Sequence, residues 1–95
     1  MLVPEISYTL RTVAPDTDLA LQAKDRVQLV FIGEYDAREE LHWVEVIECL
    51  QDSVHRARVL EDSAVFHDLP AGEIIYFRPD HILQLLMGGT AYGRA

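Results

Sequence analysis

The chain has 95 residues, of which 49% are hydrophobic and 25% are charged, so it is long enough for one folded domain and too short for two. Its formal net charge of −8 repels phosphate backbones and anionic lipid headgroups, which excludes nucleic acid and membrane surfaces as expected partners. The longest uncharged, apolar-rich stretch, Ile82–Gly93, falls short of the roughly 20 residues that a transmembrane helix needs.

Cys49 is the only cysteine, which excludes an internal disulfide and any zinc site built from several cysteines. The first residues, Met1–Glu5, lack the basic region and the apolar run of a secretion signal. Both features favour a reducing compartment, and we expect the protein in the cytoplasm.

The first predicted element is a strand over Glu5–Val13, because apolar side chains occupy every second position there. Turn-forming residues follow over Ala14–Asp18. The next segment, Leu19–Lys24, fits either one helical turn or an extended approach to the next strand, and the sequence leaves both open.

Three further strands are expected in the middle of the chain. Arg26–Tyr35 is rich in β-branched and aromatic residues and apolar on both faces, which indicates the central strand of a sheet. Glu40–Leu50 and Val54–Leu60 are separated by a polar turn and predict a hairpin.

The hairpin has one register with coherent cross-strand chemistry, in which a two-residue loop is flanked by Leu50 and Ser53. This register places Cys49 and His55 on opposite faces of the sheet, although a longer loop remains open because Gln-Asp is a poor two-residue turn. The register pairs Val44 with Val59, Glu45 with Arg58 and Val46 with Ala57.

Leu69–Gly72 predicts a tight turn, with glycine available for a positive φ, and Glu73–Arg78 predicts the last strand. After Pro79, we expect a short helix that Asp80 caps and Gly88 ends, since Ile82, Leu83 and Leu86 form an apolar stripe.

These elements predict a mainly β fold, a small SH3-like barrel or a strongly curled antiparallel sheet, with a short C-terminal helix. We expect residues 1–88 to form a single domain and residues 89–95 to form a flexible tail. The predicted core consists of Val27, Leu29, Phe31, Val44, Val46, Val59, Ile75 and Phe77.

Three strings in this order, Asp25–Phe31, His42–Val46 and Ala71–Ile82, carry a family resemblance. The chain resembles, over roughly residues 24 to 84, a family of small bacterial proteins known as a domain of unknown function, and more loosely the immunity proteins that neutralise polymorphic toxins. Ala57 departs from that pattern, which has a glycine there. The resemblance implies a β fold, and it supplies no catalytic residue.

Scattered histidines and the lone thiol are the candidates for chemistry. His42, His55, His67 and His81 are spaced as successive strands would be, but no closely spaced pair anchors a metal site, so we expect neither metal nor cofactor. Cys49 lacks a base on its own face in the predicted register. No nucleotide-binding loop or hydrolase elbow is present in the sequence, so an enzyme is not the favoured class.

Acidic residues are concentrated on either side of the predicted hairpin. The register brings the two groups to the same end of the sheet, where they form either a solvated rim or a docking face for a basic protein. Trp43 fits core packing or an exposed contact point. The candidate partner-binding residues are Glu34, Asp36, Glu39, Glu40, His42, Trp43, Glu61 and Asp62.

The function most consistent with this sequence is a non-enzymatic, acidic protein-binding module, in the manner of an immunity protein or antitoxin that covers a basic surface. One alternative is a structural or regulatory subunit that assembles with itself. Another is a small metal-dependent enzyme that uses the histidines and carboxylates.

Overall fold

The computed structural model describes residues 7–13, 21–87 and 90–93, and within them the fold is a single antiparallel sheet. Two short 3₁₀ helices interrupt the strands, one at Gln51–Ser53 and one at Pro79–His81. The strands are β1 (Tyr8–Leu10), β2 (Arg26–Gly33), β3 (Glu39–Cys49), β4 (His55–Val59), β5 (Ile74–Phe77), β6 (Ile82–Met87) and β7 (Thr90–Gly93).

Strand β2 lies at the centre of the sheet, as the sequence predicted. The chain runs from β2 to β5 as a meander, and β6 then returns to pair with the first half of β2. Strand β1 pairs with the second half of the same edge of β2, so β6 and β1 follow one another along it.

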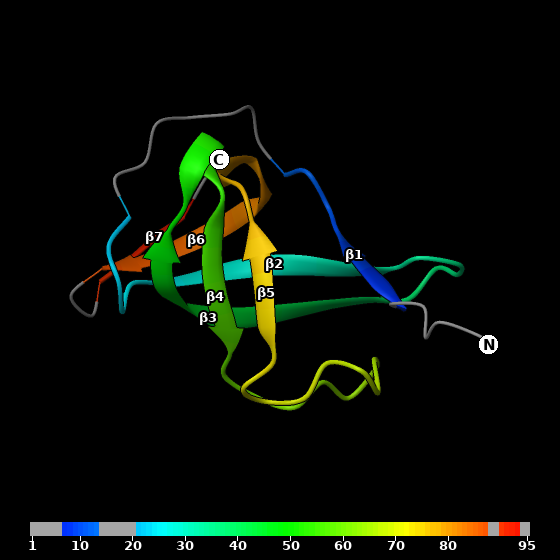
Figure 1. The fold of residues 1–95 in the computed structure, drawn as a ribbon. Helices are drawn as coiled ribbons and strands as arrows, with labels where there is room; N and C mark the ends of the chain where they lie inside the picture. The colour runs from blue at the N-terminus through cyan, green and yellow to red at the C-terminus, as the bar shows by residue number, and fades with distance from the viewer. Residues whose placement is uncertain (1–6, 14–20, 88–89, 94–95) are drawn as a thin grey trace.

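Strand β3 is long, and it pairs with a different strand along each half of its length. Its first residues pair with β2 and its last residues pair with β4, with the changeover near Val44 and Glu45. In Figure 1, β4 and β5 cross in front of β2 and β6, so the sheet curls over itself into a half-barrel. The predicted mainly β, strongly curled antiparallel sheet is confirmed.

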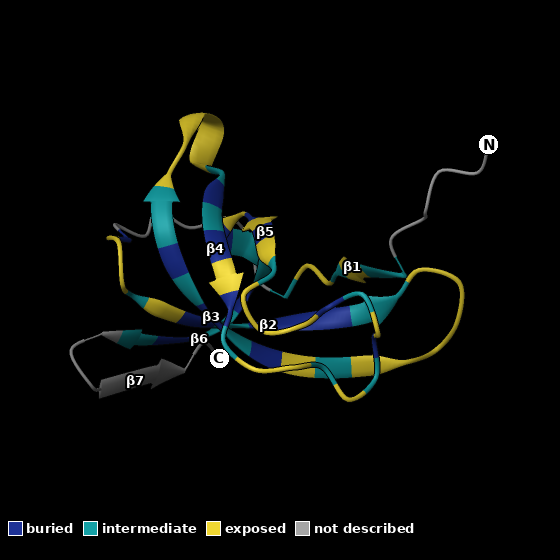
Figure 2. Ribbon diagram, turned by 60° about the horizontal axis from the view of Figure 1, so that its bottom comes forward, coloured by how far each residue is buried: buried dark blue, intermediate teal, exposed yellow. Residues whose placement is uncertain are grey.

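All eight residues of the predicted core are buried in one cluster. On β3, buried side chains alternate with more exposed ones, which is visible as the banding of that strand in Figure 2. The cluster is completed by residues that sequence analysis did not assign to it, namely Leu21, Ala57, Phe66, Leu69, Ile82 and Leu85.

The predicted hairpin register is confirmed from Val44 to Val46 and wrong beyond Ile47. A β-bulge at Ile47 shifts the pairing by one residue, so Cys49 lies directly opposite His55. Opposed residues share a face, and the expectation that these two side chains lie on opposite faces is therefore wrong.

The hairpin loop has three residues instead of two, because Leu50 N donates to Val54 O at 2.7 Å. Asp52 and Ser53 adopt left-handed conformations, with φ of 60° and 62°. A short polar side chain tolerates this region, which explains how Gln-Asp-Ser serves as a turn without glycine.

The predicted C-terminal helix is wrong. Pro79–His81 forms a 3₁₀ helix, and the residues after it form strand β6 on β2. The pairing jumps from Gln84 to Ile82, which leaves Leu83 as the extra residue of a bulge. The bulge turns Ile82 and Leu85 toward the same core, while Leu83 and Leu86, which the sequence placed on a helical stripe with Ile82, are half-buried.

The remaining elements agree in part with the boundaries predicted from the sequence. Tyr8–Leu10 is a strand inside the predicted Glu5–Val13, while Ala14–Asp18 lies outside the described residues. Residues 22–25 form a turn, closed by a hydrogen bond from Asp25 N to Gln22 O, and Leu21 before it lies in the core. Gly72 has the positive φ, 88°, that the predicted turn requires.

Strand β7 pairs with β6 inside the range predicted as a tail, and the flexibility of residues 89–95 stays a prediction. Among the residues that the structure describes, no helix is long and apolar enough to cross a membrane.

Candidate functional site

The turn between β2 and β3 and the first residue of β3 carry three of the acidic residues predicted to bind a partner, and two of the three are paired with arginines. Asp36 accepts a hydrogen bond from Arg38 Nε at 2.8 Å, and this bond lowers the pKa of the Asp36 carboxyl. Glu39 accepts two hydrogen bonds from Arg11, at 3.0 and 3.1 Å. Glu34 is exposed. The arginines thus offset much of the negative charge at this turn.

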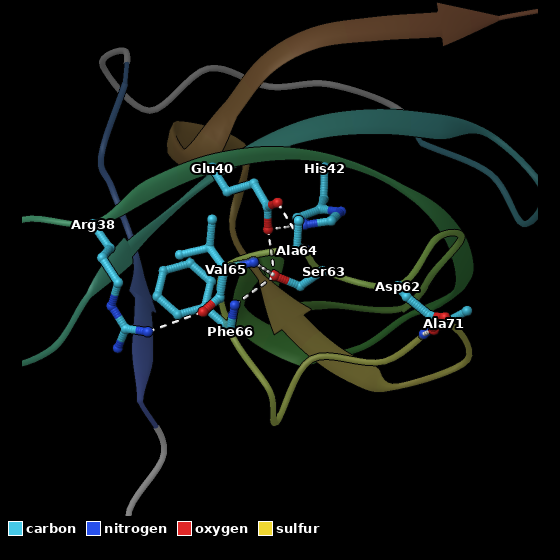
Figure 3. A network of polar contacts seen from close by, with 9 residues as sticks. All are labelled: Arg38, Glu40, His42, Asp62, Ser63, Ala64, Val65, Phe66 and Ala71. Atoms are coloured by element: carbon cyan, nitrogen blue, oxygen red, sulfur yellow. Dashed lines mark hydrogen bonds and ion pairs between the residues drawn. The ribbon is translucent and has the colours of Figure 1, made fainter.

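Glu40, on β3, turns its carboxylate inward toward the loop that follows β4. The Ser63 hydroxyl donates to Glu40 Oε1, and Ala64 N donates to Oε2 at 3.0 Å, as Figure 3 shows. Burial alone raises the pKa of Glu40, but the hydrogen bonds from Ser63, His42 and Ala64 N outweigh it and lower that pKa overall. Glu40 therefore holds the loop in place, and its role in partner binding stays a prediction.

The same loop is fixed by its own backbone. The Ser63 hydroxyl oxygen accepts hydrogen bonds from Val65 N and Phe66 N, which closes a tight turn. Arg38 donates to Val65 O at 2.9 Å and lies 4.9 Å from the centre of the Phe66 ring. Because Phe66 is buried in the core, the loop is an ordered part of the surface.

The acidic segment, which we define as residues 61–73, is a part of the chain where negative charge is not balanced by a nearby lysine or arginine in the sequence. It contains Glu61, Asp62, Asp68 and Glu73, and no lysine or arginine occurs anywhere in residues 59–77. Asp62 accepts a hydrogen bond from Ala71 N at 2.8 Å, and none of the four carboxylates forms an ion pair with a described residue. This segment therefore has more uncompensated negative charge than the β2–β3 turn.

The two non-acidic residues of the predicted site lie on opposite faces of β3. His42 is buried, contacts the ring of Phe31 and hydrogen-bonds Glu40. It can therefore act on a partner only through the loop that Glu40 holds. The Trp43 side chain is half-buried on the other face, and the Trp43 backbone carbonyl accepts a hydrogen bond from Leu60 N.

The histidines lie apart. His55 is buried beside Phe77, and burial lowers its pKa, whereas His67 is exposed. Within the described ranges, no three histidine, cysteine or acidic side chains gather as metal ligands. The Cys49 thiol donates to Leu21 O at 3.2 Å, and it forms no hydrogen bond with His55 among the described contacts.

A groove that sequence analysis did not predict lies between β1 and β5. Its volume is about 550 Å³, within the range of small-ligand and peptide sites. Hydrogen bonds hold β1 beside the groove. Ser7 bonds Asp68, which lines it, and Val13 N donates at 2.8 Å to Asp80 O, next to the lining residue His81. The β1–β5 groove is lined by residues 8–10 of β1, residues 74–76 of β5, Phe31, Asp68, Glu73 and His81.

Both strands turn unpaired backbone groups toward the groove. In an antiparallel strand, successive residues direct their N–H and C=O groups to opposite sides. Val59 N bonds Glu73 O and Arg11 N bonds Val30 O, which sets the alternation on each strand. The outward groups are therefore those of Ile74 and Tyr76 on β5 and of Tyr8 and Leu10 on β1.

The charged side chains that line the groove are acidic, so the electrostatic potential there is negative. Burial raises the pKa of Tyr8, and the nearby carboxylates of Glu73 and Asp68 raise it further. For Asp68 itself, burial raises the pKa, but the hydrogen bonds from Ser7 outweigh burial and lower it overall. Burial lowers the pKa of His81 and so favours its neutral ring. The nearby carboxylate of Asp80 acts in the opposite direction but does not outweigh burial. The groove thus combines an apolar floor with a carboxylate rim.

One signal for this groove was present in the sequence. Residues 74–77, Ile-Ile-Tyr-Phe, are apolar on both faces, which is typical of a strand covered on both sides. Strand β5 nevertheless has one neighbour among the described strands, and its outward residues Ile74 and Tyr76 are 43% and 54% exposed. An apolar edge strand of this kind indicates an interaction surface.

No protein-family model matches the chain, and comparison with curated proteins and with solved structures finds no match either.

Proposed function

We propose that this protein is a non-enzymatic module that binds a basic protein partner through the acidic segment 61–73. The observation that carries the proposal is the placement of four carboxylates, without any balancing lysine or arginine, on an ordered loop beside an apolar groove. Complementary charge accelerates encounter with a basic surface, and the adjoining apolar area supplies the contact that holds it.

Glu61 and Asp62, from the predicted site, belong to this segment. Around them, Glu40 and His42 support the loop, while Glu34, Asp36, Glu39 and Trp43 form the outer part of the proposed surface. A partner with a basic surface is the chemistry that this arrangement accepts, and an inhibitor or immunity protein in the cytoplasm is the biological setting that we propose for it.

The absence of catalysis is also part of the proposal. Its support is that the Cys49 proton is directed to Leu21 O and the Glu40 carboxylate is occupied by the loop, so neither is poised as nucleophile or base. We further propose that the fold is an SH3-like barrel. The support is the order of elements, in which the β2–β5 meander is followed by a 3₁₀ helix and by a strand that returns to β2.

The test is capture of partners from an extract of the native host in low salt, with matched variants as bait. Glu61→Gln/Glu73→Gln removes two charges from the acidic segment. The control, Asp25→Asn/Asp52→Asn, removes two charges outside the acidic segment. Asparagine can still accept the hydrogen bond from Gln22 N at position 25, and it tolerates the left-handed conformation at position 52.

We expect the wild type and the control to retain a basic protein that elutes as salt rises, and the Glu61→Gln/Glu73→Gln variant to bind it about tenfold more weakly. Equal retention by the two variants, or retention that salt does not affect, contradicts the proposal.

A further inference from the structure

We propose that the β1–β5 groove binds an extended segment of the basic partner, which adds as a strand to the free edge of β5. The inference rests on the proposed function and specifies the recognition mode. The segment has alternating apolar and basic residues, with the apolar side chains against the half-buried Tyr8 and Leu10 and the basic ones beside Asp68 and Glu73.

The first argument is the unpaired backbone. Ile74 and Tyr76 direct their N–H and C=O groups away from β4, toward the groove, where an added strand finds both donors and acceptors in register. Residues of both β1 and β5 line the groove, and the bonds from Ser7 to Asp68 and from Val13 to Asp80 hold β1 at both ends. The opening is therefore set by the fold before any partner arrives.

The second argument is the chemistry of the lining. The floor is apolar, and Asp68 and Glu73 are the charged carboxylates that line it, while no lysine or arginine does so. Two arginines stand on the neighbouring strand β4, but Arg56 is paired with Glu48 and Arg58 with Glu45. An acidic or neutral polar segment would leave the two rim carboxylates without a counter-charge, whereas lysine or arginine supplies one.

The test uses four synthetic hexapeptides and the ¹⁵N-labelled protein, and binding is followed by backbone amide chemical shifts. One peptide alternates valine with lysine, and a second alternates valine with glutamate. The third and fourth repeat the valine and lysine peptide with alternate backbone nitrogens methylated, one in each possible register, because strand addition uses the N–H groups of one register only.

We expect the valine and lysine peptide to shift the amides of Ile74 and Tyr76 in a saturable way. The valine and glutamate peptide should bind at least about tenfold more weakly, and methylation in one register should abolish the shifts. In the protein, Tyr76→Pro removes an outward N–H at no cost to the β4 ladder and should abolish the shifts, whereas Tyr76→Ala, which keeps that N–H, should retain them.

Several outcomes overturn the inference. They are shifts confined to residues outside the groove, no shifts at all, equal binding of the acidic peptide, or binding that survives methylation in both registers. Concentration-dependent shifts of the same amides without peptide would assign the groove to a second copy of this chain instead. If the peptides fail while Glu61→Gln/Glu73→Gln still releases the captured partner, the groove is excluded and the proposed function stands.

Discussion

Ser7 and Asp68 lie 61 positions apart in the sequence, yet the backbone N–H and the hydroxyl of Ser7 both donate hydrogen bonds to the carboxylate of Asp68. This contact fastens β1 to the acidic segment beside the β1–β5 groove, which Asp68 lines. The shape of the groove therefore depends on one long-range polar contact as well as on the sheet.

Replacing Asp68 with alanine should lower the free energy of unfolding by about 2 kcal/mol, because hydrogen bonds to a charged group are each worth roughly 1.5 to 3 kcal/mol when the partner is removed. Urea denaturation measures the effect. Glu61→Gln, which removes an exposed carboxylate from the same segment, is the control and should change stability by less than about 0.5 kcal/mol. Equal effects of the two changes would show that Ser7 does not depend on Asp68.

Phe31→Ala tests the core beneath the groove. Phe31 is fully buried and meets the rings of Tyr8 and His42 edge-on. Its truncation should cost about 3 to 5 kcal/mol through lost burial and the cavity left behind. Leu41→Ala, on the exposed side of β3, serves as the comparison. A loss below about 1 kcal/mol for Phe31→Ala would place this ring outside the core.

Stability should fall in acid, and Glu40 should be one cause. Its hydrogen bonds lower its folded-state pKa below the ordinary 4.5, so the folded protein binds fewer protons than the unfolded chain in that range. The stabilisation is present above pH 4.5 and is lost as pH falls through the folded-state pKa. Asp36 and Asp68 contribute in the same direction.

The check is the free energy of unfolding measured from pH 6 to pH 3 for the wild type and for Glu40→Gln. The variant should be less stable at pH 6 and show a shallower decline below pH 4.5. Parallel curves for the two proteins would mean that Glu40 titrates alike in both states.

The variant Cys49→Ser tests whether the thiol of Cys49 has a structural role or acts as a nucleophile. Serine can keep the hydrogen bond to Leu21 O, so stability should change by less than about 1 kcal/mol and partner binding should be unchanged. The bulge at Ile47 makes this test sharper, since Cys49 and His55 share a face. Complete loss of function in a folded Cys49→Ser protein would revive a cysteine nucleophile.

The sequence predicted what depends on local pattern. Alternation identified the strands and their core faces, and the pairing of Glu45 with Arg58 identified the register of the hairpin. The two errors, the register of the hairpin beyond Ile47 and the helix predicted after Pro79, both coincide with a β-bulge. The extra residues at Ile47 and Leu83 break the period of two, and nothing in a single sequence marks where a strand takes in an extra residue.

The groove depends on contacts that no local pattern encodes. Its walls come from strands more than sixty residues apart, and which strand edges stay unpaired is a property of the whole sheet. The acidic residues were found from composition, but their roles were not. Only the structure separates Glu40, which anchors a loop, from Glu73, which lines the groove.

Amide hydrogen exchange at β5, measured with and without the captured basic partner, tests the account most directly. In the free protein, Ile75 and Phe77 should exchange slowly because their N–H groups face β4, while Ile74 and Tyr76 should exchange quickly. With the partner bound at saturation, Ile74 and Tyr76 should slow by at least about tenfold. Unchanged exchange of Ile74 and Tyr76 in the saturated complex would contradict the account.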